Sequence, residues 1–163
     1  MISPLAAAAL LPFALFIGFW VSFSDLKFMR IPNQASLVML AVWLLVGLLV
    51  VPFKLWALGL GLGAAVLVVT FVMNAAGLIG GGDAKFAAAM APAFIHADLA
   101  RLSLIYVACS LGAFAAHRLL KAIPPFRKAT PDWKSWTHPG FPFGTTLSAT
   151  LTFYLLALVL PLF

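Results

Sequence analysis

The sequence predicts an all-α integral membrane protein of about six transmembrane helices, because each span needs roughly 20 apolar residues. Of the 163 residues, 64% are hydrophobic and only 9% are charged. The mean hydropathy of +1.13 exceeds what a soluble domain of this length can bury. Apolar runs of spanning length recur along the whole chain. We therefore expect one transmembrane domain, residues 1–163, without a separate soluble domain.

The expected helices follow these apolar runs in order. They lie at about 5–23, 34–52, 55–76, 84–95, 99–117 and 145–163. No Lys or Arg precedes the first run, and Lys27 and Arg30 follow it, which is the reverse of the charge order in a signal peptide. The first run is therefore expected to be a retained helix with the N-terminus outside the cytoplasm.

Local signals support the second and third helices. Pro32 holds Ile31 extended, and Pro32 or Asn33 opens the second helix. In the third run, Gly59 and Gly63 form a small-xxx-small pair, which predicts close packing against another helix.

The fourth run is short, and the positive-inside rule tests whether it spans. If it does, eight Lys and Arg residues lie in the cytoplasm, and only Lys54 and Arg101 lie outside. If it only dips into the membrane, the count becomes four inside against six outside. The spanning arrangement places both termini on the non-cytoplasmic side and leaves a long cytoplasmic loop at 118–144.

The 118–144 connection has two open interpretations. It contains five prolines together with Trp133 and Trp136, interleaved with Lys and Arg. This composition fits a segment lying along the lipid interface, or a solvated loop whose charges only set topology. Since the basic residues behind the net charge of +6 lie in such connections, we expect a lipid partner and no nucleic acid.

The residues that could perform acid–base chemistry are few. The chain has no Glu, which excludes an HExxH metalloprotease. No GxS nucleophile turn is present, and Cys109, the single cysteine, is expected to serve helix packing. The spacing of His96, His117 and His138 indicates no metal site, and we expect neither metal nor cofactor.

Asp25 and Asp83 are the candidate catalytic residues. Two spans separate them, so both are expected at the cytoplasmic ends of helices. An ionisable group at such a position is costly unless it is paired or used. Two carboxylates close together share a proton, so that one acts as base and the other as acid. Pairing of the aspartates with Lys27, Arg30 or Lys85 is the alternative.

The neighbours of Asp83 are candidate supporting residues. Gly80, Gly81 and Gly82 would admit a close approach of a substrate backbone, although a flexible loop before a helix would look similar. Lys85 could favour an ionised carboxylate or extend to the lipid surface. The remaining acids fall outside this pattern: Asp98 on the opposite face and Asp132 in the polar loop.

At these residues the sequence resembles the type IV prepilin peptidases, specifically the short form of Flp-type tight-adherence pili. The matching segments are Asp25-Leu26 through Ile31-Pro32-Asn33, Gly80-Gly81-Gly82-Asp83-Ala84-Lys85, and Phe141-Pro142-Phe143-Gly144. Longer members carry an N-terminal cytoplasmic domain with paired CxxC motifs and also methylate the pilin. This sequence lacks that domain, so methyltransferase activity is not expected.

The resemblance implies that Asp25 and Asp83 are the catalytic pair of a GxGD-type protease in the bacterial inner membrane, with Pro32 and Asn33 among the matched positions. The substrate would be a prepilin whose short basic leader is removed on the cytoplasmic side, just before its hydrophobic helix. Two alternatives from other classes are a small proton- or cation-coupled transporter using the same aspartates, and a structural assembly subunit.

Overall fold

The computed structural model describes residues 1–160, and these residues form helices and connections without a strand. The elements are α1 (Pro4–Phe28), α2 (Asn33–Val42), η1 (Trp43–Gly47), α3 (Leu48–Val50), α4 (Phe53–Ala75), α5 (Gly81–Met90), η2 (Ala91–Phe94), α6 (Leu99–Ala122), α7 (Pro124–Ala129), η3 (Lys134–Trp136) and α8 (Phe143–Val159). The predicted all-α membrane fold is confirmed. The end of the predicted run at 145–163 lies outside the described residues.

Four helices are long and apolar enough to cross a membrane. They are α1, the continuous segment Asn33–Val50, α4 and α6. The last helix, α8, is apolar but has 17 residues, and the run at 84–95 forms the 10-residue α5 followed by a short 3₁₀ turn. The count of about six spans and the side on which each terminus lies remain predictions.

The core forms where α1 packs along α8. Leu10, Ala14, Ile17 and Val21 lie on one face of α1 and are almost fully buried, as are Leu151 and Leu155 on α8. This spacing of three to four residues follows the helical period. Large apolar side chains elsewhere, above all on α4, are exposed, as expected for surfaces that face lipid.

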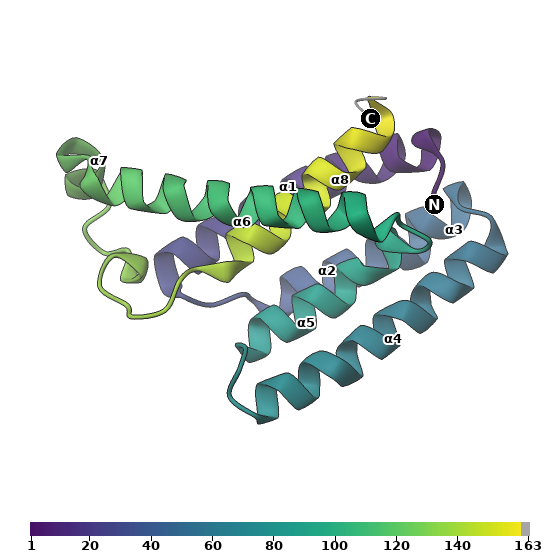
Figure 1. The fold of residues 1–163 in the computed structure, drawn as a ribbon, viewed down its shortest axis with the longest axis horizontal. Coiled ribbons are helices and arrows are strands. Elements are labelled where there is room, and N and C mark those ends of the chain that lie inside the picture. The colour runs from purple at the N-terminus through teal and green to yellow at the C-terminus, as the bar shows by residue number, and fades with distance from the viewer. Residues whose placement is uncertain (161–163) are drawn as a thin grey trace.

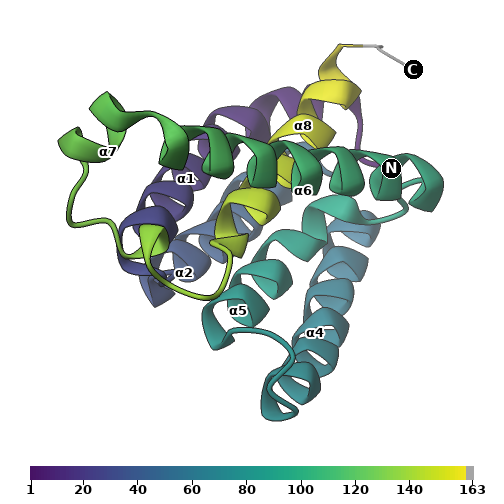
Figure 2. The same ribbon diagram turned by 60° about the vertical axis from the view of Figure 1, so that its left-hand side comes forward.

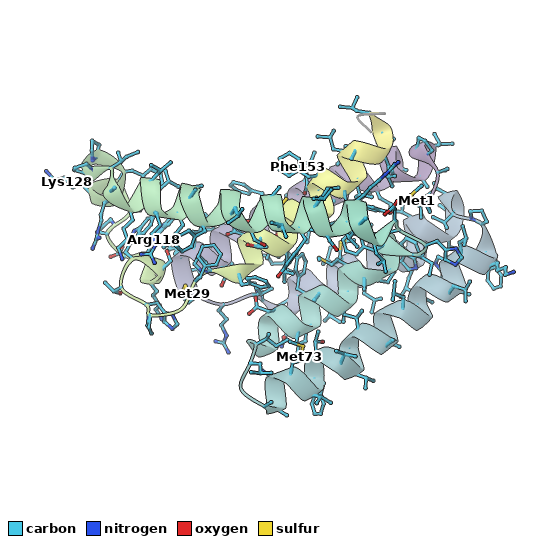
Figure 3. All side chains as sticks on the ribbon, in the orientation of Figure 1. Met1, Met29, Met73, Arg118, Lys128 and Phe153 are labelled. Carbon is cyan, nitrogen blue, oxygen red and sulfur yellow. The ribbon has the colours of Figure 1, made fainter. Side chains whose placement is uncertain are left out.

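The connections between helices gather at two ends of the molecule (Figures 1 and 2). In Figure 1, α7, the α1–α2 connection and the segment before α8 lie in the left-hand half, and the α4–α5 connection lies at the lower edge, left of centre. The N-terminus, the α3–α4 turn and the η2–α6 turn lie toward the right. Figure 3 likewise separates Met29, Arg118 and Lys128 from Met1. The segments that carry Asp25 and Asp83 therefore share one end.

The predicted contact through the glycine pair of α4 is confirmed. A Cβ built on Gly59 would lie 2.6 Å from Cζ2 of Trp43, and one on Gly63 would lie 3.1 Å from the carbonyl oxygen of Ala88. Both glycines are buried. They let α4 approach the α2 segment and α5 more closely than any side chain would allow.

Several predicted boundaries were wrong. The first helix does not end near 23 but continues to Phe28, so that Asp25 lies within its last turns. The fifth helix extends beyond 117 to Ala122, and α7 and η3 occupy part of the 118–144 connection. The basic residues there do not end the helix, because Lys and Arg are good helix formers and cations are favoured near a helix C-terminus. The guanidinium carbon of Arg118 lies 5.0 Å from the ring centre of Phe114.

The second predicted helix changes its winding at Trp43–Gly47, where five residues are π-helical. The indole N–H of Trp56 donates to the carbonyl of Trp43 at 3.0 Å, and the indole N–H of Trp43 donates to the carbonyl of Trp56 at 3.3 Å. This reciprocal pair supplies partners for backbone groups at the irregular turn.

Candidate active site

Asp25 is positioned by the turn that ends α1. Met29 adopts a left-handed conformation with φ 52°, and its backbone N–H donates to the carbonyl of Asp25 at 2.8 Å. The Ser24 hydroxyl donates to the carbonyl of Arg30 at 2.9 Å, which draws the following chain back against the helix. Asp25 itself is 5% exposed, so its carboxylate is largely enclosed by the surrounding protein.

Asp83 is positioned by the loop between α4 and α5. The side-chain amide of Asn74 donates to the carbonyl of Ile79 at 2.8 Å, and Gly77 turns the chain with φ 74°. Helix α5 then begins at Gly81, and Asp83 lies in its first turn. A carboxylate is favoured there by the free backbone N–H groups and the helix dipole.

The three glycines before Asp83 have different surroundings. A Cβ built on Gly80 would lie 2.6 Å from Oδ2 of Asp83, and one on Gly82 would lie 3.1 Å from Cβ of Ile31. The corresponding closest approach at Gly81 is an ordinary 3.7 Å, to the Asn74 side chain. Two of the three therefore permit close approaches, one to the carboxylate and one between α5 and the α1–α2 connection.

The start of α8 completes the surroundings of Asp25. The backbone N–H of Gly144 donates to Oδ2 of Asp25 at 2.7 Å. This N–H belongs to the first turn of α8, where backbone donors have no partner within the helix. A Cβ on Gly144 would lie 2.9 Å from Cδ1 of Ile31 and 3.0 Å from that same oxygen of Asp25. Glycine is therefore required for this contact.

Asp25 and Asp83 line one cavity of about 760 Å³. Its walls are formed by the end of α1, the connection into α2, the glycine segment and Lys134 of η3. The negative charge of Asp83 acts on the carboxylate of Asp25. Burial raises the pKa of the Asp83 carboxyl above its ordinary range, and the backbone N–H of Gly80 opposes that rise. The two aspartates, 58 positions apart in the sequence, thus line the same cavity.

In the described part of the chain, the two aspartates are not paired with the basic residues near them, and Lys27 has aromatic partners instead. Within residues 1–160, neither Asp25 nor Asp83 forms an ion pair. Lys27 lies 5.7 Å from the ring centre of Phe23, and its side chain also faces Phe28. The structure therefore offers no support for the alternative in which the aspartates are neutralised by adjacent cations.

Two supporting candidates meet beside this cavity. The ammonium group of Lys85 donates to Oδ1 of Asn33 at 3.1 Å. Pro32 provides the N-cap residue of α2, and Asn33 is its first helical residue, as predicted. Lys85 and Asn33 join α5 to α2, and both line the cavity. The direct effect of Lys85 on a carboxylate remains a prediction.

The other aspartates lie away from the cavity. Asp98 accepts backbone hydrogen bonds from Ala100 and Arg101 at the start of α6, and its carboxylate lies 3.8 Å from the Arg101 side chain. Asp98 and Met1 line another small cavity, which places Asp98 toward the end opposite the candidate site. Asp132 is exposed in a turn.

The histidines occupy three different settings. His117 is buried inside α6 and stacks on Trp136 at 5.2 Å between ring centres. His96 adopts φ 55° in the turn before α6, and His138 accepts the backbone N–H of Gly140. Among residues 1–160, no three His, Cys, Asp or Glu side chains cluster as a metal site would require.

Sequence reasoning missed three contributors to the site. Gly144 belongs to a segment singled out by the resemblance, but its hydrogen bond to Asp25 was not anticipated. Ile31 packs against both Gly82 and Gly144, and Lys134 reaches the cavity from a connection expected to be loop. A signal was available for Gly144 alone: it directly follows Pro142-Phe143 at a helix start, where free N–H groups are expected.

Comparison with known protein families bears directly on this geometry. A model of the type IV leader peptidase family matches residues 9–117, which is more than half of the chain. The chain belongs to the type IV leader peptidase family. The matched range includes both aspartates of the cavity, whereas Gly144 lies beyond it. Searches of curated proteins and of solved structures gave no match.

Membership of this family identifies the chain as related to proteases that act on leader peptides. Together with the four helices of spanning length, it describes a membrane protein of the peptidase class. The type IV leader peptidase family would act on pilin-type substrates. The cavity that Asp25 and Asp83 line is therefore the candidate active site.

Proposed function

We propose that this protein is an intramembrane aspartyl endopeptidase that removes the short basic leader from Flp-type type IV prepilins at the cytoplasmic face of the bacterial inner membrane. The observation that carries the proposal is that Asp25 and Asp83, from separate helices, line one cavity. Family membership supports the leader peptidase role in general. The aspartate pair, the cellular location and the pilin class are the proposal's own additions.

The proposed reaction uses the two carboxyl groups as base and acid. The ionised group takes a proton from water, and the water oxygen attacks the carbonyl carbon of the scissile peptide bond. The protonated group donates its proton to the carbonyl oxygen as the tetrahedral intermediate forms. Collapse of that intermediate breaks the C–N bond. The leaving nitrogen takes the proton that the first carboxyl group removed from water, and a hydroxyl proton of the intermediate returns to the second group, which restores the starting pair. No metal, cofactor or covalent intermediate is required.

The surroundings of the carboxyl groups support a shared proton. The Gly144 N–H favours a charged Asp25, and the first turn of α5 favours a charged Asp83. Repulsion between the two charges opposes simultaneous ionisation, since two close carboxylates titrate as a coupled pair. A pair with one proton and one negative charge is the state that the reaction needs.

Co-expression with a candidate prepilin tests the proposal. We expect Asp25→Asn and Asp83→Asn each to abolish leader removal, seen on a gel as loss of the shorter product, because asparagine can neither take nor donate the proton. Asp98→Asn is the matched control and should cleave at the wild-type rate, since asparagine serves equally well as the N-cap of α6.

Continued cleavage by either catalytic variant would exclude the aspartate-pair mechanism. The transporter alternative predicts a different pattern, in which wild-type membranes leave the prepilin intact and ion flux depends on Asp25 and Asp83. The same proposal includes supporting roles for residues beside the aspartates: Gly80, Gly81, Gly82, Lys85, Pro32 and Asn33. Because these residues make different contacts, each role can be tested by its own substitution.

A further inference from the structure

A second cavity continues from the candidate active site into the membrane-facing part of the molecule. It has a volume of about 530 Å³, lies between α2, α4 and α5, and is here called the α2–α4–α5 groove. Asn33 and Lys85 line both this groove and the cavity that holds the aspartates. The groove therefore begins where the polar site ends.

The lining of the groove is apolar except at its junction with the active-site cavity. The apolar part is formed mainly by leucine and alanine side chains: Leu37, Leu40, Leu60, Ala64, Leu67, Ala88 and Ala89. Near the junction, Ser36 lies one helical turn after Asn33. The Ser36 side chain is buried, with 8% of the residue exposed, and its hydroxyl has no hydrogen-bond partner among residues 1–160.

We propose that the α2–α4–α5 groove binds the hydrophobic segment that follows the scissile bond of the prepilin, with Asn33 and Ser36 hydrogen-bonding its first backbone groups. This inference rests on the proposed peptidase function and assigns the substrate side of the same site. The occupant is a peptide segment that is polar at the cleavage point and apolar beyond it. That order matches the change in lining from the aspartate cavity to the groove.

The need to unwind the substrate explains why polar groups are placed at the junction. A helical peptide bond is shielded from attack by water, so the residues at the cleavage point must leave the helix. Backbone groups freed in this way are tolerated at membrane depth only where protein or water supplies partners. Ser36 and the Asn33 amide provide such partners, and the leucine and alanine walls then receive the part that remains apolar.

A lipid chain fits the same observations less well. The CH₂ groups of an acyl chain would leave the Ser36 hydroxyl without a partner, and an unpaired buried hydroxyl is unfavourable. An unwound peptide presents a carbonyl acceptor at every residue. The continuity with the aspartate cavity likewise favours the molecule that is cut there.

Two adjacent alanines of α4 provide a matched test. Ala64 and Ala65 are both exposed, but only Ala64 lines the groove. Cleavage is measured for an intact prepilin and for a short peptide that ends just after the scissile bond. In Ala64→Trp we expect the ratio of kcat/KM for prepilin to kcat/KM for the peptide to fall about tenfold, because the indole fills the groove. In Ala65→Trp the ratio should keep its wild-type value.

Cross-linking provides a readout that does not depend on turnover. Ala64→Cys and Ala65→Cys are each combined with Cys109→Ala, which removes the single native cysteine, and with Asp83→Asn. When a mild oxidant such as copper phenanthroline is added, a prepilin carrying one cysteine in its hydrophobic segment should form a disulfide with the Ala64→Cys variant and not with the Ala65→Cys variant.

The outcomes distinguish failure of the groove assignment from failure of the proposed peptidase function. Equal ratios for the two tryptophan variants of an active enzyme, or equal cross-linking at both positions, would overturn the groove assignment and leave the peptidase proposal standing. Absence of prepilin and peptide cleavage by the wild-type protein would overturn the peptidase function, and the groove assignment with it.

Discussion

At the scale of single residues, Gly80 and Gly81 differ in what a side chain would meet. Gly80→Ala would place a methyl group 2.6 Å from Oδ2 of Asp83, and the carboxylate would have to move. Since displacement of a catalytic group by about 1 Å can cost about a hundredfold, we expect kcat to fall roughly ten- to a hundredfold. Steady-state cleavage of a prepilin measures this.

Gly81→Ala is the matched control, because the nearest atom to its Cβ is an ordinary 3.7 Å away. It should keep most of the wild-type kcat. A similar loss in both variants would show that the segment needs flexibility rather than space beside Asp83.

The aspartates could be predicted from the sequence, whereas their surroundings could not. With Glu absent and four aspartates in the chain, helix order alone indicates that Asp25 and Asp83 share one end. The contact of Asp25 with the Gly144 N–H joins residues 119 positions apart. Such a contact depends on how α8 packs along α1, which a hydropathy pattern does not specify.

At the scale of helices, the close packing of α4 depends on Gly59 and Gly63, which face its neighbours, and not on Gly61. Gly59→Ala would bring a methyl group within 2.6 Å of the Trp43 ring and 3.1 Å of the Pro92 carbonyl. Overpacking of this kind costs about 1–3 kcal/mol. We therefore expect a lower unfolding temperature in detergent, measured by circular dichroism.

Gly61→Ala serves as the control because a Cβ there meets nothing within 4 Å. Its higher helix propensity should leave the unfolding temperature unchanged or raise it slightly. Equal destabilisation by both substitutions would contradict the close contact between α4 and its neighbours.

Helix positions followed from the apolar runs, but their irregular parts did not. The π-helical turn at Trp43–Gly47 depends on Trp56 from the next helix, so no local pattern indicates it. Helix α6 continues to Ala122 although its last turns carry charged residues, because Lys and Arg are good helix formers and a cation is favoured near a helix C-terminus. A hydropathy pattern indicates neither feature.

At the scale of the whole molecule, the distribution of Lys and Arg predicts the orientation of the protein in the membrane. In a Cys109→Ala background, we expect Lys54→Cys to react with a membrane-impermeant maleimide added to intact cells and Lys128→Cys to stay unlabelled. Both side chains are exposed, and Lys128 lies at the end of the molecule that carries Met29. The expectation follows from the excess of Lys and Arg on the cytoplasmic side.

The reverse labelling pattern would place the aspartate cavity outside the cytoplasm. Opening the cells should label both variants, which checks that each cysteine is reactive. A prepilin leader that stays in the cytoplasm could not be removed by a protein in the reversed orientation.

The bond from Gly144 to Asp25 has a consequence for the order of events during biosynthesis. A ribosome-bound chain acquires both acidic groups before α8 has been made, yet the amide that fixes one of them is supplied by α8. A nascent polypeptide that still lacks α8 would therefore carry the acids in an unfinished arrangement. In the proposed peptidase, competence to cut would come only once α8 has been made and has docked.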